Sequence, residues 1–204
     1  MLRMTHSVDL SYEPSSFFPI IIHSFLVKEY DSVKDELIKN SYELKKNDPE
    51  GADISNVGGW QSNSSSLSDD NLTLNNIIFS SIRTLPLIEN ISVDIAGWTN
   101  INCPGSFNTK HTHPNCHLSG VFWIKIPDNS GDIIFDDPNN FKKFVEAESY
   151  DEDFKKYFRC GRGIKHSPKE GQVLIFPSYV EHMVGVNDSS EDRISYAFNI
   201  HINL

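Results

Sequence analysis

Three histidines in two short segments have the residue type and the spacing of a metal site. His111 and His113 are one residue apart, so in an extended strand both side chains point to the same side. His182 comes much later and would complete the set from another strand. Neutral imidazole binds iron, zinc, copper and nickel, so the three histidines alone do not name the metal.

A basic side chain that can bind an organic acid follows the third histidine. Arg193 lies eleven residues after His182, and its guanidinium can bind a carboxylate through two parallel hydrogen bonds. Ser195 would face the same way in a strand and add a hydroxyl donor. A surface pairing of Arg193 with Glu191 or Asp192 is the simpler alternative, but the nearby histidines favour the carboxylate. The combination predicts an iron enzyme with an organic-acid co-substrate.

Short strands separated by turns are predicted to position these residues. The apolar segments typical of strands lie at 17–27, 91–103, 118–126, 132–135, 172–176, 183–186 and 194–202. Helical spacing of apolar residues predicts one helix after Asp31 and a second within 69–88. Helices followed by a run of short strands indicate a mainly β fold with flanking helices, a jelly roll with the helices packed outside it.

Two segments interrupt this pattern. Residues 47–66 are rich in Gly, Ser, Asn and Asp and are predicted to form a loop. Within that loop, Trp60 would either anchor the loop on the core or form a wall of a substrate cleft. Residues 139–169 are highly charged and contain scattered aromatic residues. This insertion is either a partly helical cover over a site or a solvated excursion.

Bulk properties limit the classes of function. The 204 residues fit a single domain, in which 1–90 supply an N-terminal strand and supporting helices and 91–204 supply a jelly-roll core. Hydrophobic residues make up 38% and charged residues 23%, as in a globular protein. The net charge of −10 and the pI near 5.2 argue against binding to nucleic acid or to anionic membrane.

The absence of a membrane span and of a secretory signal predicts a cytoplasmic protein. No apolar run is long enough to span a membrane, and the first residues lack the pattern of a secretory signal. Cys103, Cys116 and Cys160 are odd in number and show no C-x-x-C spacing, which argues against a disulfide framework or a structural zinc site. We expect buried or idle thiols.

An ordered series of motifs resembles the 2-oxoglutarate and iron(II)-dependent oxygenases. The motifs are H-x-H-P at 111–114, L-S-G-V-F-W at 118–123, G-D-I-I-F-D-D-P at 131–138, F-P-S at 176–178 with His182, and R-I-S at 193–195 with F-N at 198–199. The match runs from about Trp98 to Asn199, and G-W-Q-S at 59–62 extends it backward. Within this superfamily the chain most resembles an uncharacterised oxygenase family with the pattern HxHP…LSGVYY…FPS…H…RIS.

The resemblance implies a fold, two cofactors and a reaction. The fold is a double-stranded β-helix, a distorted, cupin-like jelly roll with iron at its mouth. His111 and His182 would bind Fe(II), while Arg193 and Ser195 would hold the distal carboxylate of 2-oxoglutarate. The reaction is the O2-dependent hydroxylation, or another oxidation, of a small molecule or a protein side chain, with release of succinate and CO2. Four further side chains are candidates to line the site: Trp60, Asn102, Ser119 and Trp123.

The third metal ligand departs from the pattern of the wider superfamily. The usual first motif is His-x-Asp or His-x-Glu, which gives two histidines and one carboxylate. Here the third residue of the motif is His113, a neutral ligand that would leave the iron more positive. Three alternatives follow: His113 is the ligand, water fills the position, or Asp136 or Asp137 supplies a carboxylate. We favour His113.

Two other functions are compatible with the same residues. A cupin-like metal dioxygenase or isomerase would need no 2-oxoglutarate, and a noncatalytic binding module could use the same jelly roll. Arg193 separates the first alternative from the oxygenase, because only the oxygenase needs it for 2-oxoglutarate. The sequence leaves the oligomeric state open, with a homodimer as the default expectation.

Overall fold

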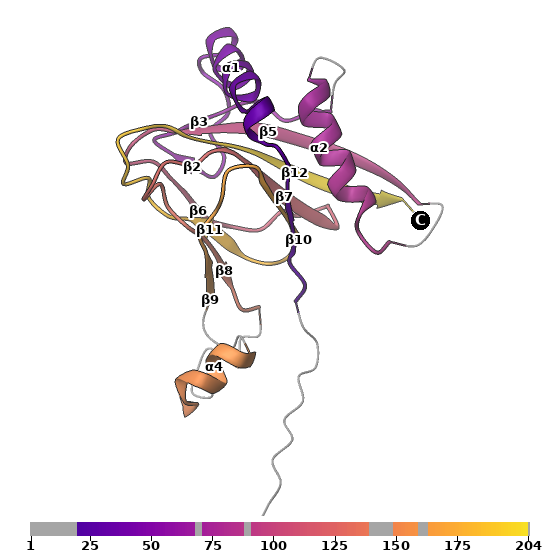
Figure 1. Ribbon diagram of the computed structural model, residues 1–204, viewed down its shortest axis with the longest axis vertical. Coiled ribbons are helices and arrows are strands. Elements are labelled where there is room, and N and C mark those ends of the chain that lie inside the picture. Colours follow the sequence, from indigo (N-terminus) through magenta and orange to yellow (C-terminus); the bar gives the residue numbers. More distant parts are fainter. Residues whose placement is uncertain (1–19, 68–70, 88–90, 139–148, 159–162, 204) are drawn as a thin grey trace, which may run out of the picture.

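Two antiparallel β-sheets face each other, and two helices cover the outer face of the larger sheet (Figure 1). The computed structural model describes residues 20–67, 71–87, 91–138, 149–158 and 163–203. The arrangement is a double-stranded β-helix with few helices, which confirms the predicted fold class. None of the helices in these ranges is long and apolar enough to cross a membrane.

The larger sheet has seven strands, with the long strand β12 between β7 and β5. Its order is β1-β10-β7-β12-β5-β3, and β4 also pairs with β5. The strands are β1 (His23–Leu26), β3 (Trp60–Gln61), β4 (Ser65–Ser66), β5 (Ser92–Asn102), β7 (Leu118–Lys125), β10 (Gln172–Pro177) and β12 (Arg193–Asn203). Every pairing in this sheet is antiparallel, so directly opposed residues share a face.

The smaller sheet has five strands in the order β2-β6-β11-β8-β9. Its strands are β2 (Asn56–Val57), β6 (Phe107–His111), β8 (Ile133–Asp136), β9 (Gly163–His166) and β11 (His182–Val184). β6 and β11 are neighbours, although they lie far apart in the sequence. This pairing brings the first and the last of the three predicted metal ligands onto adjacent strands.

The alternation of side chains in β12 divides the molecule into two cores. Ile194, Tyr196 and Phe198 face the helices and belong to the larger hydrophobic cluster. Arg193 and Ser195 face the smaller sheet, because successive side chains in a strand point to opposite faces. The smaller cluster lies between the sheets and contains Trp123, Phe135, Leu174 and Phe176, among others. The candidate site therefore lies between the sheets, on the side away from the helices.

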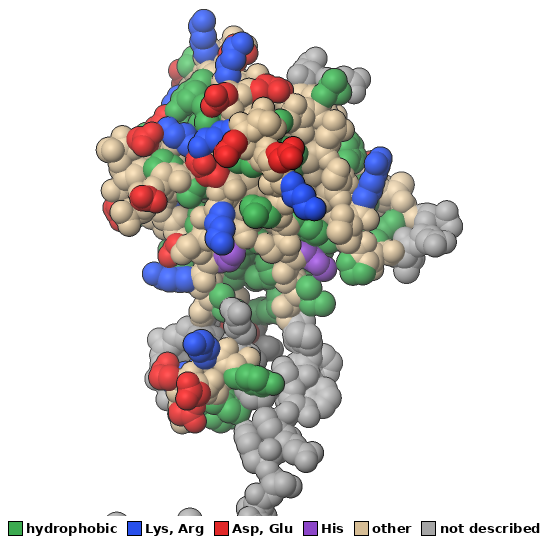
Figure 2. All heavy atoms as spheres, in the orientation of Figure 1, with side chains coloured by type: hydrophobic (Ala, Val, Ile, Leu, Met, Phe, Trp, Pro, Cys, Tyr) green, Lys and Arg blue, Asp and Glu red, His purple; other side chains and the backbone are tan. Residues whose placement is uncertain are grey.

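Helix α1 (Asp31–Asn47) and helix α2 (Leu72–Arg83) cover the outer face of the larger sheet (Figure 1). In α1, Leu37 is buried in the larger cluster, and Lys45 and Lys46 lie in the last turn, where cations favour the helix dipole. In α2, the side chain of Asn71 accepts a hydrogen bond from the backbone N–H of Leu74 at 3.1 Å and caps the helix. On the face in Figure 2, acidic and basic side chains are interspersed.

Strands that the sequence did not predict lie mostly at the sheet edges. Residues 47–66 were expected to form a loop, but β2, β3 and β4 lie there. Each has only two residues and is too short to show an alternating pattern. β6 was missed because its middle, Asn108 to Lys110, is polar. Residues 17–19 of the first predicted strand lie outside the described ranges.

The insertion at 139–169 is partly helical and partly extended. Helix α4 (Glu152–Phe158) lies within it, and β9 pairs with β8 at the edge of the smaller sheet. Figure 1 shows α4 beyond β8 and β9, away from α1 and α2. Residues 139–148 and 159–162, with Cys160 among them, lie outside the described ranges, so the role of the insertion as a cover stays a prediction. So does the single domain over 1–204 with its division at residue 90.

Candidate active site

Three imidazoles converge at one end of the space between the sheets. His111 ends β6 and lies directly opposite His182, which begins β11. His113 follows the end of β6, and its backbone N–H donates to the carbonyl oxygen of Ser178 at 3.0 Å. One ligand atom from each histidine lies within 4.8 Å of the other two. Among the described residues this is the only cluster of three such side chains, and it contains no carboxylate.

Backbone carbonyl groups orient two of these rings. Nδ1 of His111 lies 2.6 Å from the carbonyl oxygen of Thr109, and Nδ1 of His182 lies 2.9 Å from that of Val180. A carbonyl oxygen only accepts, so each Nδ1 carries the proton and each Nε2 keeps a free lone pair. Nε2 of His182 lies 3.3 Å from Nε2 of His113. Backbone-fixed histidines whose lone pairs converge are the arrangement that binds a metal ion.

Burial keeps the imidazoles of His113 and His182 neutral. It lowers the pKa of His113 to about 3, and the neighbouring His182 and His111 lower it further. Burial also lowers the pKa of His182 to about 4, although the hydrogen bond with Val180 raises it and His111 lowers it. Metal ligation requires neutral imidazole, so both rings are in the ligating form at neutral pH.

Arg193 lies at the deep end of the same space and spans the gap between the sheets. Its side chain is 2% exposed. Nη1 donates to the carbonyl oxygens of Ser130 and Gly185, the latter at 3.2 Å, while the buried Nη2 has no hydrogen-bond partner among the described residues. Burial lowers the pKa of Arg193 to about 10, so the guanidinium stays charged at pH 7. A buried cation with a free donor fits a carboxylate ligand.

The absence of a side chain at Gly131 lets the guanidinium of Arg193 reach this position. Gly131 has φ of +96°, in the region that L-residues with a side chain rarely adopt. A Cβ there would lie 2.8 Å from Nη1 of Arg193 and 2.4 Å from the carbonyl oxygen of Gly185. The glycine of the G-D-I-I-F motif therefore makes room for the guanidinium.

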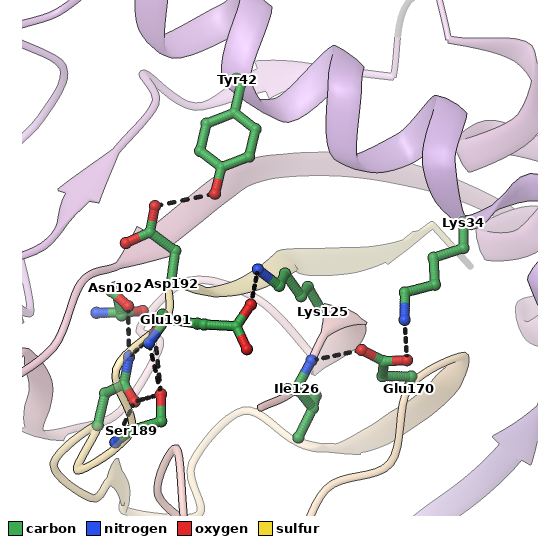
Figure 3. Close-up of polar contacts among 10 residues, drawn as sticks. Lys34, Tyr42, Asn102, Lys125, Ile126, Glu170, Ser189, Glu191 and Asp192 are labelled. Atoms are coloured by element: carbon green, nitrogen blue, oxygen red, sulfur yellow. Dashed lines mark hydrogen bonds and ion pairs between the residues drawn. The ribbon is translucent and has the colours of Figure 1, made fainter. Parts of the chain in front are cut away.

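Acidic residues near Arg193 in the sequence pair with other side chains (Figure 3). Glu191 accepts from Lys125 at 2.8 Å, and Asp192 accepts from the hydroxyl of Tyr42 on α1 at 2.9 Å. A surface pairing of Arg193 with either acid, the alternative weighed above, is therefore not formed. Nδ2 of Asn187 donates to the carbonyl oxygens of Asn102 and Glu191, at 2.8 Å each, and fixes the turn before β12.

A cavity joins the histidines to Arg193. Ser195, Asn100 and Trp123 contribute to its wall, together with the three histidines and Arg193. None of the described residues that line this cavity is Asp or Glu. Arg193 and a divalent metal would thus bring positive charge to both ends, and a dicarboxylate ligand would balance it. The donor set therefore fits Fe(II) and 2-oxoglutarate.

The four candidate lining residues have different positions. Trp123 lines the cavity, and Asn102 pairs directly with Arg193 across β5 and β12. Ser119 lies beside the cavity and donates to Oδ1 of Asn199 at 2.9 Å. Trp60 does not line this cavity: it pairs with Ile101, belongs to the core under the helices and faces the opposite side of the larger sheet. The interpretation of Trp60 as an anchor is the one that agrees with this position.

Ser119 is part of a hydrogen-bond network that supports the segment carrying His113. The hydroxyls of Ser119 and Ser178 lie 2.9 Å apart, and the thiol of Cys116 donates to the hydroxyl of Ser178 at 3.2 Å. The same thiol lies 3.1 Å from the carbonyl oxygen of His113. The turn that follows β6 is thereby tied to the end of β10. Cys103 and Cys116 are both free thiols.

The nearby histidine His117 and the two alternative carboxylates lie outside the histidine cluster. His117 is exposed, its Nδ1 accepts from the backbone N–H of Ile202 at 3.0 Å, and its ring lies against that of His201, which is exposed too. Asp136, at the end of β8, forms an ion pair with Lys110. Asp137 is not a member of the cluster either.

Trp98 and Asn100 are among the cavity residues that were not singled out from the sequence. The ring of Trp98 lies 5.7 Å from that of His113, and Asn100 lies between Trp98 and Asn102 on the same face of β5. Oδ1 of Asn100 is buried, and no described residue forms a hydrogen bond with it. The asparagines at alternate positions near the end of β5, Asn100 and Asn102, were the available signal.

Comparisons with known proteins agree with this geometry. A family model described as "Putative 2OG-Fe(II) oxygenase" matches residues 96–199. A prolyl-4-hydroxylase from Pseudomonas putida superposes with a TM-score of 0.59 at 13% identity, covering 88% of this chain and 91% of that one. HygX from Streptomyces hygroscopicus, solved with nickel and 2-oxoglutarate bound, superposes with a TM-score of 0.58 at 10% identity, covering 89% and 83%.

A prolyl hydroxylase from Trichoplax adhaerens, in complex with a peptide of hypoxia inducible factor, superposes with a TM-score of 0.58 at 13% identity, covering 88% and 83%. No curated protein sequence matches the chain. At these identities the structural likeness shows the fold alone, whereas the family match covers half of the 204 residues. The chain belongs to the 2OG-Fe(II) oxygenase family, and it is a 2-oxoglutarate-dependent oxygenase, an oxidoreductase whose cofactors are Fe(II) and 2-oxoglutarate.

Proposed function

We propose that this oxygenase uses O2 and 2-oxoglutarate to hydroxylate, or otherwise oxidise, an organic substrate, with release of succinate and CO2. His111, His113 and His182 would hold Fe(II), and Arg193 and Ser195 would bind the distal carboxylate of 2-oxoglutarate. The observation that carries this proposal is the pairing of two features in one cavity: three ligand atoms within 4.8 Å of one another and the unpaired Nη2 of Arg193.

Each side chain has a separate part in this proposal. When bound, Fe(II) and 2-oxoglutarate supply the activation of O2 and the electrons for oxidation. The histidines bind through Nε2 of His111 and His182, whose Nδ1 atoms are held by backbone carbonyls. Arg193 offers its free Nη2, and Ser195, two residues along the same face of β12, offers a hydroxyl.

His113 is the proposed third ligand in place of a carboxylate. Its Nε2 lies 3.3 Å from Nε2 of His182, the cluster formed by the described residues contains no acidic side chain, and burial keeps His113 neutral. The proposed alternative carboxylate, Asp136, is engaged with Lys110. Three neutral ligands leave the full charge of the metal to be balanced by 2-oxoglutarate, which fits a cavity without acidic lining residues.

The substrate would be a small molecule or the side chain of a protein. Trp98, Trp123 and Phe176 form the aromatic part of the cavity wall, which would exclude water from the reacting groups. The similar structures include both kinds of system: one is solved with a peptide bound, and another is a carbocyclase of nogalamycin biosynthesis.

Succinate formation tests this function. The purified protein would be loaded anaerobically with Fe(II) and then given 2-oxoglutarate and O2, with succinate quantified for the wild type, His182→Ala and Arg193→Ala. We expect succinate from the wild type and from Arg83→Ala, a control at an exposed arginine on α2, and none from the two site variants.

Other outcomes would support the alternative functions. Iron retention without affinity for 2-oxoglutarate would contradict the proposal and favour a cupin-like enzyme that does not use this co-substrate. Binding of neither iron nor 2-oxoglutarate would favour a noncatalytic binding module. Isothermal titration calorimetry with each component separately distinguishes the two results.

A further inference from the structure

A second cavity lies on the opposite face of the larger sheet from the histidines. Its volume is about 410 Å³, within the usual range of small-molecule sites. It is bordered by the C-terminal half of α1, the start of α2 and the short strands β3 and β4. Trp60, which does not line the histidine cavity, lines this one. The floor is formed by Gly97, Thr99 and Tyr196.

Two hydroxyl groups on this floor have no hydrogen-bond partner among the described residues. Thr99 and Tyr196 are directly opposed in the pairing of β5 with β12. Thr99 is 3% exposed and Tyr196 is 6% exposed, and both line the cavity. Neither side-chain hydroxyl forms a hydrogen bond with any described residue, and neither oxygen is itself fully buried, so both hydroxyls open onto the cavity. Burial raises the pKa of Tyr196 to about 12, so its hydroxyl remains a donor.

Gly97 provides the space that the hydroxyl of Tyr196 occupies. A Cβ at Gly97 would lie 2.2 Å from Oη of Tyr196, closer than any real contact. The ring of Tyr196 lies over the backbone of β5 and is stacked on Phe198 with ring centroids 6.3 Å apart. The phenol is therefore held in place, with its hydroxyl at the edge of an open space.

The remaining lining side chains restrict the charge of a ligand. None of the described lining residues is Lys, Arg or His, and two are acidic, so an anion would be repelled. The carboxylate of Asp48 already accepts from the backbone N–H of Gly51 at 3.2 Å and from Nδ2 of Asn63 at 2.9 Å. Oε1 of Glu43 lies 3.7 Å from Nζ of Lys39. Both acids already have partners within the protein, whereas the hydroxyls of Thr99 and Tyr196 have none among the described residues.

Uncharged hydrogen-bonding groups dominate the rest of the wall. Amides and hydroxyls come from Asn40 on α1, from Ser62 directly after β3 and from Asn71 directly before α2, although the Ser62 hydroxyl and Oδ1 of Asn71 also bond within the protein. Trp60 adds a large apolar ring whose Nε1 is already bonded to the carbonyl oxygen of Asp48 at 2.9 Å. Amides and hydroxyls both donate and accept, which matches a ligand that carries several hydroxyl groups.

We propose that this cavity is a binding site for a neutral, polyhydroxylated small molecule such as a sugar or polyol, contacted by the hydroxyls of Thr99 and Tyr196. The site is separate from the metal centre and does not depend on the proposed reaction. Its floor is nevertheless formed by the strands that carry Asn100 and Ser195, whose side chains project from the other face of the same sheet.

Saturation-transfer NMR with the full-length protein tests the site. The probe is glucose, with gluconate and glucosamine as its anionic and cationic relatives. We expect saturable binding of glucose and weaker binding of both charged relatives. Tyr196→Phe, which keeps the ring and removes the hydroxyl, should weaken glucose binding about tenfold. Thr99→Val, which keeps the shape, should also weaken it.

Matched controls separate this cavity from the rest of the molecule. Tyr42→Phe removes a hydroxyl on α1 that bonds Asp192, and it should leave glucose binding unchanged. His182→Ala should also leave it unchanged, because the histidines lie on the other side of the sheet. Loss of binding in His182→Ala, equal binding by Tyr196→Phe and the wild type, preference for a charged relative, or no saturable binding would each overturn the proposal.

Discussion

Arg193 and Gly185 connect the two sheets. Arg193 lies on β12 in the larger sheet, and its Nη1 donates, at 3.2 Å, to the carbonyl oxygen of Gly185, which directly follows β11 in the smaller sheet. This contact places the guanidinium across the deep end of the cavity while its Nη2 stays unpaired. The protein thus maintains a buried positive charge without a compensating carboxylate among the described lining residues. The charge is costly in the ligand-free protein and favourable when an acid is bound.

Replacement of this arginine should separate binding from stability. Arg193→Met removes the buried charge and keeps an unbranched side chain, so we expect the free energy of unfolding to stay equal or to rise. Binding of 2-oxoglutarate should be lost. Arg193→Lys keeps the charge but cannot donate two parallel hydrogen bonds to one carboxylate. The affinity of this variant for 2-oxoglutarate should fall about tenfold or more. Chemical denaturation and calorimetry measure the two properties, and a destabilised Met variant would contradict the expectation.

Gly131 should be required for the position of the guanidinium. Gly131→Ala adds a Cβ that would lie 2.4 Å from the backbone of Gly185, so both stability and 2-oxoglutarate affinity should fall. Gly105→Ala is a matched control, since Gly105 also has positive φ, at 85°, but a Cβ there has no neighbour within 4 Å. The control variant should lose only about 1 kcal/mol of stability, because of backbone strain, and should bind 2-oxoglutarate as the wild type does. Equal affinities in both variants would refute this role.

The third ligand can be identified through metal affinity. His113→Ala should weaken binding of Fe(II), or of Co(II) as a spectroscopic probe, by roughly 100-fold or more. His113→Asp should restore much of the affinity, because a carboxylate is also a ligand for these ions. His117→Ala, at the exposed histidine outside the cluster, is the control and should bind as the wild type does. A normal affinity in His113→Ala would indicate that water fills the third position.

The metal-free protein should become less stable as the pH falls. The pKa values of His113 and His182 are lowered to about 3 and about 4 in the folded chain, whereas an unfolded histidine has a pKa of about 6.5. Below about pH 6.5 the unfolded state binds more protons than the folded state. Their contribution to stability is therefore complete above that pH and is lost as the pH falls through the folded values.

The free energy of unfolding should fall by up to about 1.4 kcal/mol per pH unit for each of these two histidines. Thermal unfolding between pH 7 and pH 5, in the presence of a chelator, measures the slope. His113→Asn should reduce it, whereas His201→Asn, at an exposed residue, should leave it unchanged. Identical slopes in His113→Asn and the wild type would show that another group controls the acid sensitivity.

The long strands and the types of the site residues could be predicted from the sequence, because both have local signals. Apolar side chains alternate along β12, and His111 and His113 have the spacing of a strand. β6 has no alternating apolar pattern from which a strand could be predicted, because its buried residue beside the cavity is the polar Asn108. That polar position exists because β6 faces a cavity rather than a packed core.

The convergence of the site could not be predicted from local patterns. His111 meets His182 through the register between β6 and β11, which depends on the assembly of the whole smaller sheet. For the same reason, the sequence did not decide whether Trp60 packs in the core or lines the substrate cleft. In a two-residue strand no alternation shows which face a side chain takes, and the pairing with Ile101 decides it.

The central position of β12 has a consequence for synthesis on the ribosome. β5 and β7 emerge long before β12, yet they meet only through it. Until β12 is translated, both neighbours present open edges, which are prone to pair with other chains. The same late strand carries Arg193 and Ser195, so a nascent chain that lacks it has neither a closed sheet nor the proposed anchor for the acid. Chaperone protection would matter most during this interval.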